Sequence, residues 1–286
     1  MDNPVCLVTG VGPQKGTGGE IARRFAEGGY RVAMLARDGE NLAKIESNVQ
    51  NTMAFPCDVG NLGALRTTIG KVRERLGNPA VVVHNALRSV RGGILELDPN
   101  DLERNFRVNT TALLHLARET IPAMLDVGQG AILVTGNTSA TRGKTNWGFF
   151  AATKAAQRIL AESIAREFGP KGIHVAYFII DASIDTPRTR PVLAPDKPDE
   201  YFCKPRAIAD EMYHVAHQDR SAWSFRVELR PFGEVLGLEE PDLGREDGLH
   251  HPECEYGEDP DGHGVLLGLM TRPGDATSYH TMITGA

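Results

Sequence analysis

Short runs of β-branched and other apolar residues recur along the first part of the chain, and longer amphipathic segments separate them. The runs occupy residues 5–9, 31–36, 52–57, 80–84, 130–136 and 174–180. In the segments between them, apolar residues stand three or four positions apart, as do Leu113 and Leu116, or Ile21 and Phe25. This alternation predicts an α/β fold, a Rossmann-like doubly wound parallel sheet with helices on both faces. Asp98 before Pro99 marks one helix start.

The end of the chain differs in composition from the rest. Residues 238–286 hold eleven acidic residues against two basic ones, together with eight glycines. They show no apolar periodicity before Val265. We therefore expect a folded domain over residues 1–237 and a weakly structured acidic tail over residues 238–286.

Composition argues against several classes of protein. The formal net charge of −6 gives no basis for binding nucleic acid or membranes, and no apolar run approaches the ~18 residues of a membrane span. No secretory signal is visible. The four cysteines form no CxxC pair, which favours reduced thiols and a cytoplasmic protein. His250, His251, Cys254 and His263 match no zinc spacing, so we predict no metal site.

A glycine-rich loop follows the first predicted strand. Gly12, Gly16 and Gly18 lie in this loop, and an amphipathic segment begins directly after it. Glycines let a backbone approach a pyrophosphate, and the start of a helix supplies amide donors and a positive dipole end. A simple tight turn is the alternative. The position, at the carboxyl end of a strand in an open sheet, favours a dinucleotide site.

Further motifs resemble those of the short-chain dehydrogenase/reductase family over residues 4–237. Thr9-Gly10 and Gly16-Thr17-Gly18 match the family's glycine motif with two additional residues between them. His84-Asn85-Ala86-Leu87 stands for the family's Asn-Asn-Ala-Gly. Asp58-Val59 matches the family's contact to adenine, and Ile184 and Thr186 lie in the segment that contacts the carboxamide.

The end of the second predicted strand bears on the choice of cofactor. NAD-binding proteins of this fold carry an acid there, whereas this chain has Ala36 followed by Arg37. Lys15 in the glycine loop is a second basic residue, and a 2′-phosphate needs such donors. We expect NADP, with NAD possible. The predicted cofactor site comprises Gly10, Gly12, Lys15, Gly16, Gly18, Arg37, Asp58, Val59, Asn85, Ala86, Lys154, Ile184 and Thr186.

The resemblance fails at the residue that matters most for catalysis. Family members carry a catalytic tyrosine four positions before the lysine matched by Lys154, and this chain has Phe150 there. A serine 12 or 13 positions before the tyrosine holds the substrate oxygen, and those positions are Thr138 and Asn137. Loss of a general acid removes ~10²–10⁴ in rate. The Phe-x-x-x-Lys pattern also resembles a branch of the family.

The sequence leaves three interpretations open. In the first, another acid serves an oxidoreductase, with Asp181 as the candidate, although its position favours a cap of the next segment over an acid role. Alternatively, the fold binds NADP for non-redox chemistry or regulation. In the third interpretation, the substrate supplies its own proton relay, and Asn109, which matches the family's holder of a proton-relay water, organises water with Lys154. The predicted catalytic set is Asn109, Thr138, Phe150, Lys154 and Asp181.

The resemblance also implies partners. We expect an NAD(P)(H)-dependent oxidoreductase that acts on a small carbonyl or alcohol substrate and forms a homodimer or homotetramer.

Overall fold

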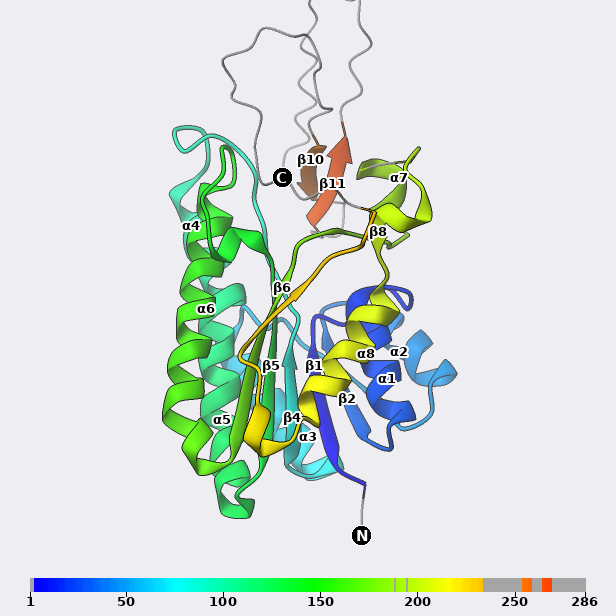
Figure 1. Cartoon of the computed structure of the whole chain (residues 1–286), viewed down its shortest axis with the longest axis vertical. Helices are drawn as coiled ribbons and strands as arrows, with labels where there is room; N and C mark the ends of the chain where they lie inside the picture. Colours follow the sequence, from blue (N-terminus) through cyan, green and yellow to red (C-terminus); the bar gives the residue numbers. More distant parts are fainter. Residues whose placement is uncertain (1–2, 188, 194, 234–253, 259–263, 269–286) are drawn as a thin grey trace, which may run out of the picture.

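A seven-stranded sheet forms the centre of the molecule (Figure 1). The computed structural model describes residues 3–187, 189–193, 195–233, 254–258 and 264–268. The strand order is β3-β2-β1-β4-β5-β6-β9, and every neighbouring pair is parallel. The strands are β1 (Val5–Thr9), β2 (Arg31–Ala36), β3 (Thr52–Pro56), β4 (Pro79–His84), β5 (Gly130–Gly136), β6 (Ile173–Ile180) and β9 (Arg226–Leu229). This arrangement confirms the predicted fold, and six strands lie within one residue of their predicted bounds.

Helices cover both faces of the sheet, and each face has its own apolar core (Figure 1). One layer contains α1 (Thr17–Glu27), α2 (Gly39–Asn48) and α8 (Pro205–Ala216). The other contains α3 (Leu62–Leu76), α5 (Ala112–Val127) and α6 (Gly148–Phe168). Ile21 and Phe25 are buried in the first core, and Leu113 and Leu116 in the second. Burial of each such side chain contributes ~1.5–3 kcal/mol, so the predicted periodicity fixes which helix face meets the sheet.

The sequence did not predict β9. This strand has only four residues, Arg-Val-Glu-Leu, in which exposed and half-buried positions alternate. It pairs with β6 alone and forms an edge of the sheet. Short edge strands that carry charge are common in natural sheets because they discourage pairing with another chain. The same features make such a strand resemble a loop in the sequence.

A distorted helix lies beside the carboxyl edge of the sheet. It begins with α4 (Pro99–Phe106), where the Asp98 carboxylate accepts a hydrogen bond of 2.9 Å from the backbone N–H of Asn100. The predicted helix start is thereby confirmed. A π-helical turn (Arg107–Thr111) joins α4 to α5. Single π-turns interrupt the regular ladder and frequently mark functional sites. Here the turn contains Asn109.

Short elements complete the described residues. β7 (Ser183–Ile184) pairs with β8 (Phe202–Cys203), and α7 (Arg190–Leu193) lies between them in the chain. β10 (Cys254–Glu258) and β11 (Gly264–Gly268) form an antiparallel pair within the predicted tail. The remainder of 238–286 lies outside the described residues, so the division at residue 237 stays a prediction. None of the helices described here is both long and apolar enough to cross a bilayer.

The turn before β6 is closely packed at the amino ends of the strands, where Gly172 lies against Gly128. Gly172 has φ +93°, and a Cβ there would lie 2.2 Å from the backbone oxygen of Gly128. We expect Gly172→Ala to lower the free energy of unfolding by more than about 1 kcal/mol, because both the backbone and its neighbour would have to move. Urea denaturation measures it. Gly70→Ala is the control, since nothing lies within 4 Å of that Cβ, and we expect it to stabilise α3 by ~0.5–1 kcal/mol. Equal effects of the two changes would contradict this packing.

Candidate functional site

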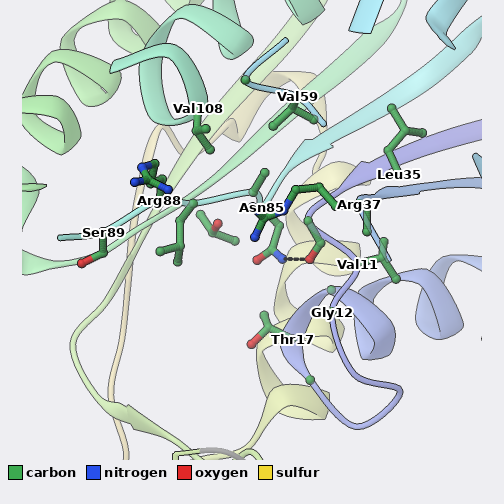
Figure 2. A pocket seen from close by; sticks show the side chains of 18 of the residues that line it. Val11, Gly12, Thr17, Leu35, Arg37, Val59, Asn85, Arg88, Ser89 and Val108 are labelled. Atoms are coloured by element: carbon green, nitrogen blue, oxygen red, sulfur yellow. Dashed lines mark hydrogen bonds between the residues drawn. The ribbon is translucent and has the colours of Figure 1, made fainter. Parts of the chain in front are cut away.

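A cleft of about 1280 Å³ opens at the carboxyl ends of the parallel strands. Figure 2 shows Val11, Leu35 and Arg37 on one side of it and Arg88 and Ser89 on the other. Open α/β sheets bind ligands at this edge, because the loops there leave the sheet on opposite faces. The loops after β1, β2, β3, β4 and β5 all contribute lining residues.

Most of the predicted site residues line this cleft. They are Gly10, Gly12, Gly16, Gly18, Arg37, Asp58, Val59, Asn85, Ala86, Phe150, Lys154, Ile184 and Thr186. Four predicted residues do not line it: Lys15, Asn109, Thr138 and Asp181. The structure therefore brings the cofactor motifs together and separates part of the expected catalytic set from them.

The glycine loop leaves room for a backbone-bound anion. Gly10 has φ +69°, and a Cβ on Gly18 would lie 2.4 Å from the Gly10 carbonyl oxygen, so neither position accepts a side chain without displacement. Gly16 caps α1 without a side-chain hydrogen bond. The first amides of α1 therefore meet no side-chain acceptor, and a helix start of this kind suits a phosphate group. These residues fit the diphosphate of a dinucleotide.

Two contacts hold this loop in place. The Asn85 side chain donates from Nδ2 to the Gly10 carbonyl at 2.9 Å (Figure 2). Asn41 on α2 donates to the Gly12 carbonyl at 2.5 Å. Because Gly12 belongs to the segment lengthened by two residues, Asn41 fixes the enlarged part of the loop from outside. Sequence reasoning did not identify Asn41, since no motif marks it.

Lys154 lies at the bottom of the cleft and is almost fully buried. Its side chain is 2% exposed, and its Nζ donates to the Thr135 carbonyl at 2.8 Å. Burial lowers the pKa of Lys154 to about 7, because an ammonium loses hydration there. Phe150 is 3% exposed and packs against Trp147, with the ring centroids 5.8 Å apart. No phenol hydroxyl is present at this position, so Lys154 is the ionisable member that remains of the tyrosine–lysine pair expected from the family resemblance.

Asn137, and not Thr138, reaches the cleft. The Asn137 Oδ1 accepts a hydrogen bond of 3.1 Å from the backbone N–H of Ser139. A backbone N–H can only donate, so the oxygen of the amide must face it and Nδ2 takes the other position. Nδ2 forms no hydrogen bond with the described residues. The spacing of 13 residues from Phe150 was the signal for Asn137, but spacing alone did not decide between the two positions.

Asp181 lies outside the lining and next to β9. Its Oδ2 is 3.6 Å from a guanidinium nitrogen of Arg230, and its backbone N–H donates to the Leu229 carbonyl. The geometry thus gives the suggested acid role of Asp181 no support.

Asn109 braces the loop after β4. Its Oδ1 accepts from the Arg88 N–H at 2.8 Å, and its Nδ2 donates to the Arg88 carbonyl at 2.9 Å. The same Nδ2 donates to Thr153 Oγ1 at 2.8 Å. The side chain therefore shapes the cleft wall without entering it.

Several lining residues belong to no motif. They are chiefly basic or polar and include Arg88, Ser89, Arg104, Arg107 and Trp147. Asp101 lies within 3.1 Å of Arg88 and 2.8 Å of Arg104, and Asp98 lies 3.8 Å from Arg104, so these carboxylates offset part of this charge. Only the tertiary structure shows that these side chains share one cleft.

The comparisons with known proteins agree on one family. The short chain dehydrogenase model matches residues 4–196. An uncharacterised short-chain type dehydrogenase/reductase of Sinorhizobium fredii is 29% identical over 184 residues, covering 61% of this chain and 72% of that protein. Versicolorin reductase of Emericella nidulans is 28% identical over 180 residues, covering 61% and 67%. An alcohol dehydrogenase structure from the archaeon Thermococcus sibiricus, complexed with 5-hydroxy-NADP, is 26% identical with a TM-score of 0.69, covering 80% and 97%.

The burial of Lys154 predicts an unusual dependence of stability on pH. The unfolded chain holds this proton up to about pH 10.4, whereas the folded chain releases it near pH 7. Between these values the unfolded state binds more protons, so the contribution of Lys154 to stability falls as pH is lowered and levels off below about pH 7. We expect Lys154→Met to be more stable than the natural protein at pH 7, with the difference shrinking towards pH 10. Urea denaturation across this range measures it. A difference that does not vary with pH would show that Lys154 titrates normally.

Proposed function

The chain belongs to the short-chain dehydrogenase family, and from this membership we propose that it is an NADP(H)-linked oxidoreductase that works without a catalytic tyrosine. Members of the family are NAD(P)-dependent oxidoreductases, and the glycine loop and α1 fit a dinucleotide. The preference for NADP and the catalytic roles below are the proposal.

The observation that carries the proposal is the buried Lys154 at the bottom of the cleft. Its pKa of about 7 suits a group that must give up a proton near neutral pH, since general acids work best when their pKa is close to the operating pH. Lys154 and Asn137 both line the cleft. We assign the proton to Lys154 Nζ and the hydrogen bond to the substrate oxygen to Asn137 Nδ2.

The chemistry requires one hydride and one proton. A bound reduced dinucleotide would supply the hydride for the carbonyl carbon, which leaves the proton to the residues of this chain. As the C=O π bond breaks, the oxygen takes a proton from Lys154 Nζ, which becomes a neutral amine. Asn137 Nδ2 donates to the same oxygen while negative charge develops on it, and such donors stabilise the transition state. In the reverse direction, the neutral amine of Lys154 accepts the proton of the alcohol.

The relatives support a carbonyl or alcohol substrate. One is named as a versicolorin reductase and a structural neighbour as an alcohol dehydrogenase, so both names describe this type of reaction. A second candidate function is cofactor binding without redox turnover. The observation that favours it is Phe150, whose buried ring occupies the position of the family's proton donor.

The cofactor preference follows from Arg37. This exposed side chain lines the cleft and forms no ion pair within the described residues, whereas Lys15 does not line it. We expect NADPH to bind more tightly than NADH, because a charge-assisted contact to the 2′-phosphate contributes ~1.5–3 kcal/mol, roughly ten- to hundredfold in affinity. Arg37→Ala should remove the preference and Lys15→Ala should retain it. Calorimetric titration of both cofactors measures this. If Arg37→Ala keeps the preference, another group reads the phosphate.

The proposed roles can be separated by activity. We expect Lys154→Met to reduce NADPH oxidation on a panel of ketones, diketones and quinones by ~10²–10⁴. Asn137→Ala should reduce it by ~10²–10³, as the loss of one oxyanion donor does. Thr138→Ala is the control and should keep activity. Phe150→Tyr should raise activity, because it adds a second proton donor one helical turn from Lys154.

Binding of NADPH without its oxidation would contradict the proposal. If the natural protein and Phe150→Tyr both bind NADPH and neither oxidises it with any substrate of the panel, cofactor binding without redox turnover is the better description.

A further inference from the structure

A set of buried polar groups outside the cleft lining has the backbone carbonyl of Asn109 at its centre, and the charge of Lys154 acts on one of them, His84. The Gln157 side chain donates to this oxygen from Nε2 at 2.6 Å. The His84 ring contacts the same oxygen through Nε2 at 3.1 Å. Asn109, Gln157 and His84 are each 0% exposed. Asn109 stands in the π-helical turn, which releases carbonyls from the regular helix ladder.

The hydrogen-bond network fixes the state of His84. A carbonyl can only accept, so Nε2 carries the proton. Nδ1 is then the acceptor and takes a hydrogen bond from Thr9 Oγ1 at 3.1 Å. Burial, together with the charge of Lys154, lowers the pKa of His84 to about 4. The ring is therefore neutral near pH 7 and donates permanently to Asn109.

Gln157 is held equally firmly. Its Nε2 donates to Asn109, and its Oε1 accepts from the Tyr177 hydroxyl at 3.2 Å. Tyr177 is 0% exposed, and burial raises its pKa well above the ordinary value, so it stays a donor. The amide cannot turn over without placing its oxygen against the Asn109 carbonyl oxygen, and both are acceptors. Gln157 is therefore oriented by the π-helical turn and by β6.

A carbonyl oxygen has two lone pairs, and both of those on Asn109 are used. By the family resemblance, this asparagine would hold a relay water, but no acceptor site is left for one here. Building on the proposed role of Lys154, we propose that His84 and Gln157 are positioning residues that close the Asn109 carbonyl to water, so that Lys154 exchanges protons with solvent only through the cleft.

The surroundings of Lys154 agree with a single exit. Its Nζ is held by the Thr135 carbonyl of β5. His84 of β4 is the titratable group that feels its charge, and it is neutral near pH 7. Tyr177 of β6 keeps its proton. Burial alone accounts for the lowered pKa of Lys154, with no carboxylate among the described residues contributing. A bound cofactor would therefore control when the lysine regains its proton.

The experiment measures solvent exchange of the Lys154 Nζ protons by NMR on ¹⁵N-lysine-labelled protein at pH 6, with and without saturating NADP⁺. Lys154→Met assigns the resonance. We expect NADP⁺ to slow exchange at least ~10-fold in the natural protein, since each tenfold corresponds to only ~1.4 kcal/mol of barrier. In Gln157→Leu, water reaches the freed carbonyl, so exchange should be faster than in the natural protein in both states and NADP⁺ should no longer slow it.

Two further variants make the result decisive. His84→Leu removes the other donor, and the Thr9 hydroxyl can then turn to the Val83 carbonyl at 3.5 Å. We expect the same loss of protection. Thr120→Val is the matched control, because this buried hydroxyl bonds only within α5, to the Leu116 carbonyl, and it should behave like the natural protein.

Two results would contradict the proposal that the Asn109 carbonyl is closed to water. If Gln157→Leu and His84→Leu both exchange as slowly as the natural protein with NADP⁺ bound, the carbonyl is not a closed exit. If NADP⁺ leaves exchange in the natural protein unchanged, the cleft is not the only route. Neither readout requires turnover, so a failure of the oxidoreductase proposal, seen as absent NADPH oxidation, is distinguishable from a failure of this one.

Discussion

The close approach of two loops at the centre of the sheet determines much of the rest of the structure. The loop after β1 passes so near the loop after β4 that a Cβ on Gly10 would lie 2.5 Å from Ala86. Thr9 Oγ1 accepts from the backbone N–H groups of Asn85 and Ala86 at 3.2 and 3.3 Å. These hydrogen bonds satisfy amides that leave the sheet ladder. They also fix the position of the loop that leads into α1 relative to the loop after β4.

Burial has opposite effects on stability and on the proposed chemistry. A buried lysine destabilises the folded state near neutral pH, since its charged form loses hydration. The same burial places its pKa where a proton can be given and taken back. Around it, His84 is hydrogen-bonded to Thr9 and the Asn109 carbonyl, and Gln157 to the same carbonyl and to Tyr177. Buried polar groups are tolerated when they have such partners. Proteins commonly accept such local losses at functional sites.

Local sequence patterns predicted the fold, whereas the details of the site depend on contacts between residues that are far apart in the chain. The strands and the glycine loop were predictable because apolar periodicity and glycine spacing are visible within short windows. The choice between Asn137 and Thr138 was not, since only the folded structure shows that Asn137 lines the cleft and Thr138 does not. The surroundings of Asp181 required knowledge of β9, which carries no clear sequence pattern. Gln157 reaches Asn109 across 48 positions of the chain, and no local signal announces this contact.

The attachment of the glycine loop to α2 has a consequence for cofactor engineering. Asn41 belongs to the first turn of α2 and holds Gly12, while Arg37 stands two residues before the same helix. The Asp38 carboxylate between them caps α2 by accepting from the Asn41 N–H at 2.9 Å. Arg37, which is proposed to bind the adenosine phosphate, and Asn41, which supports the glycine loop, are thus both positioned by the start of α2. Substitutions at positions 37 and 38 that aim to change the nucleotide preference would also displace Asn41 and, through it, Gly12. Such redesigns should therefore retain both Asp38 and Asn41.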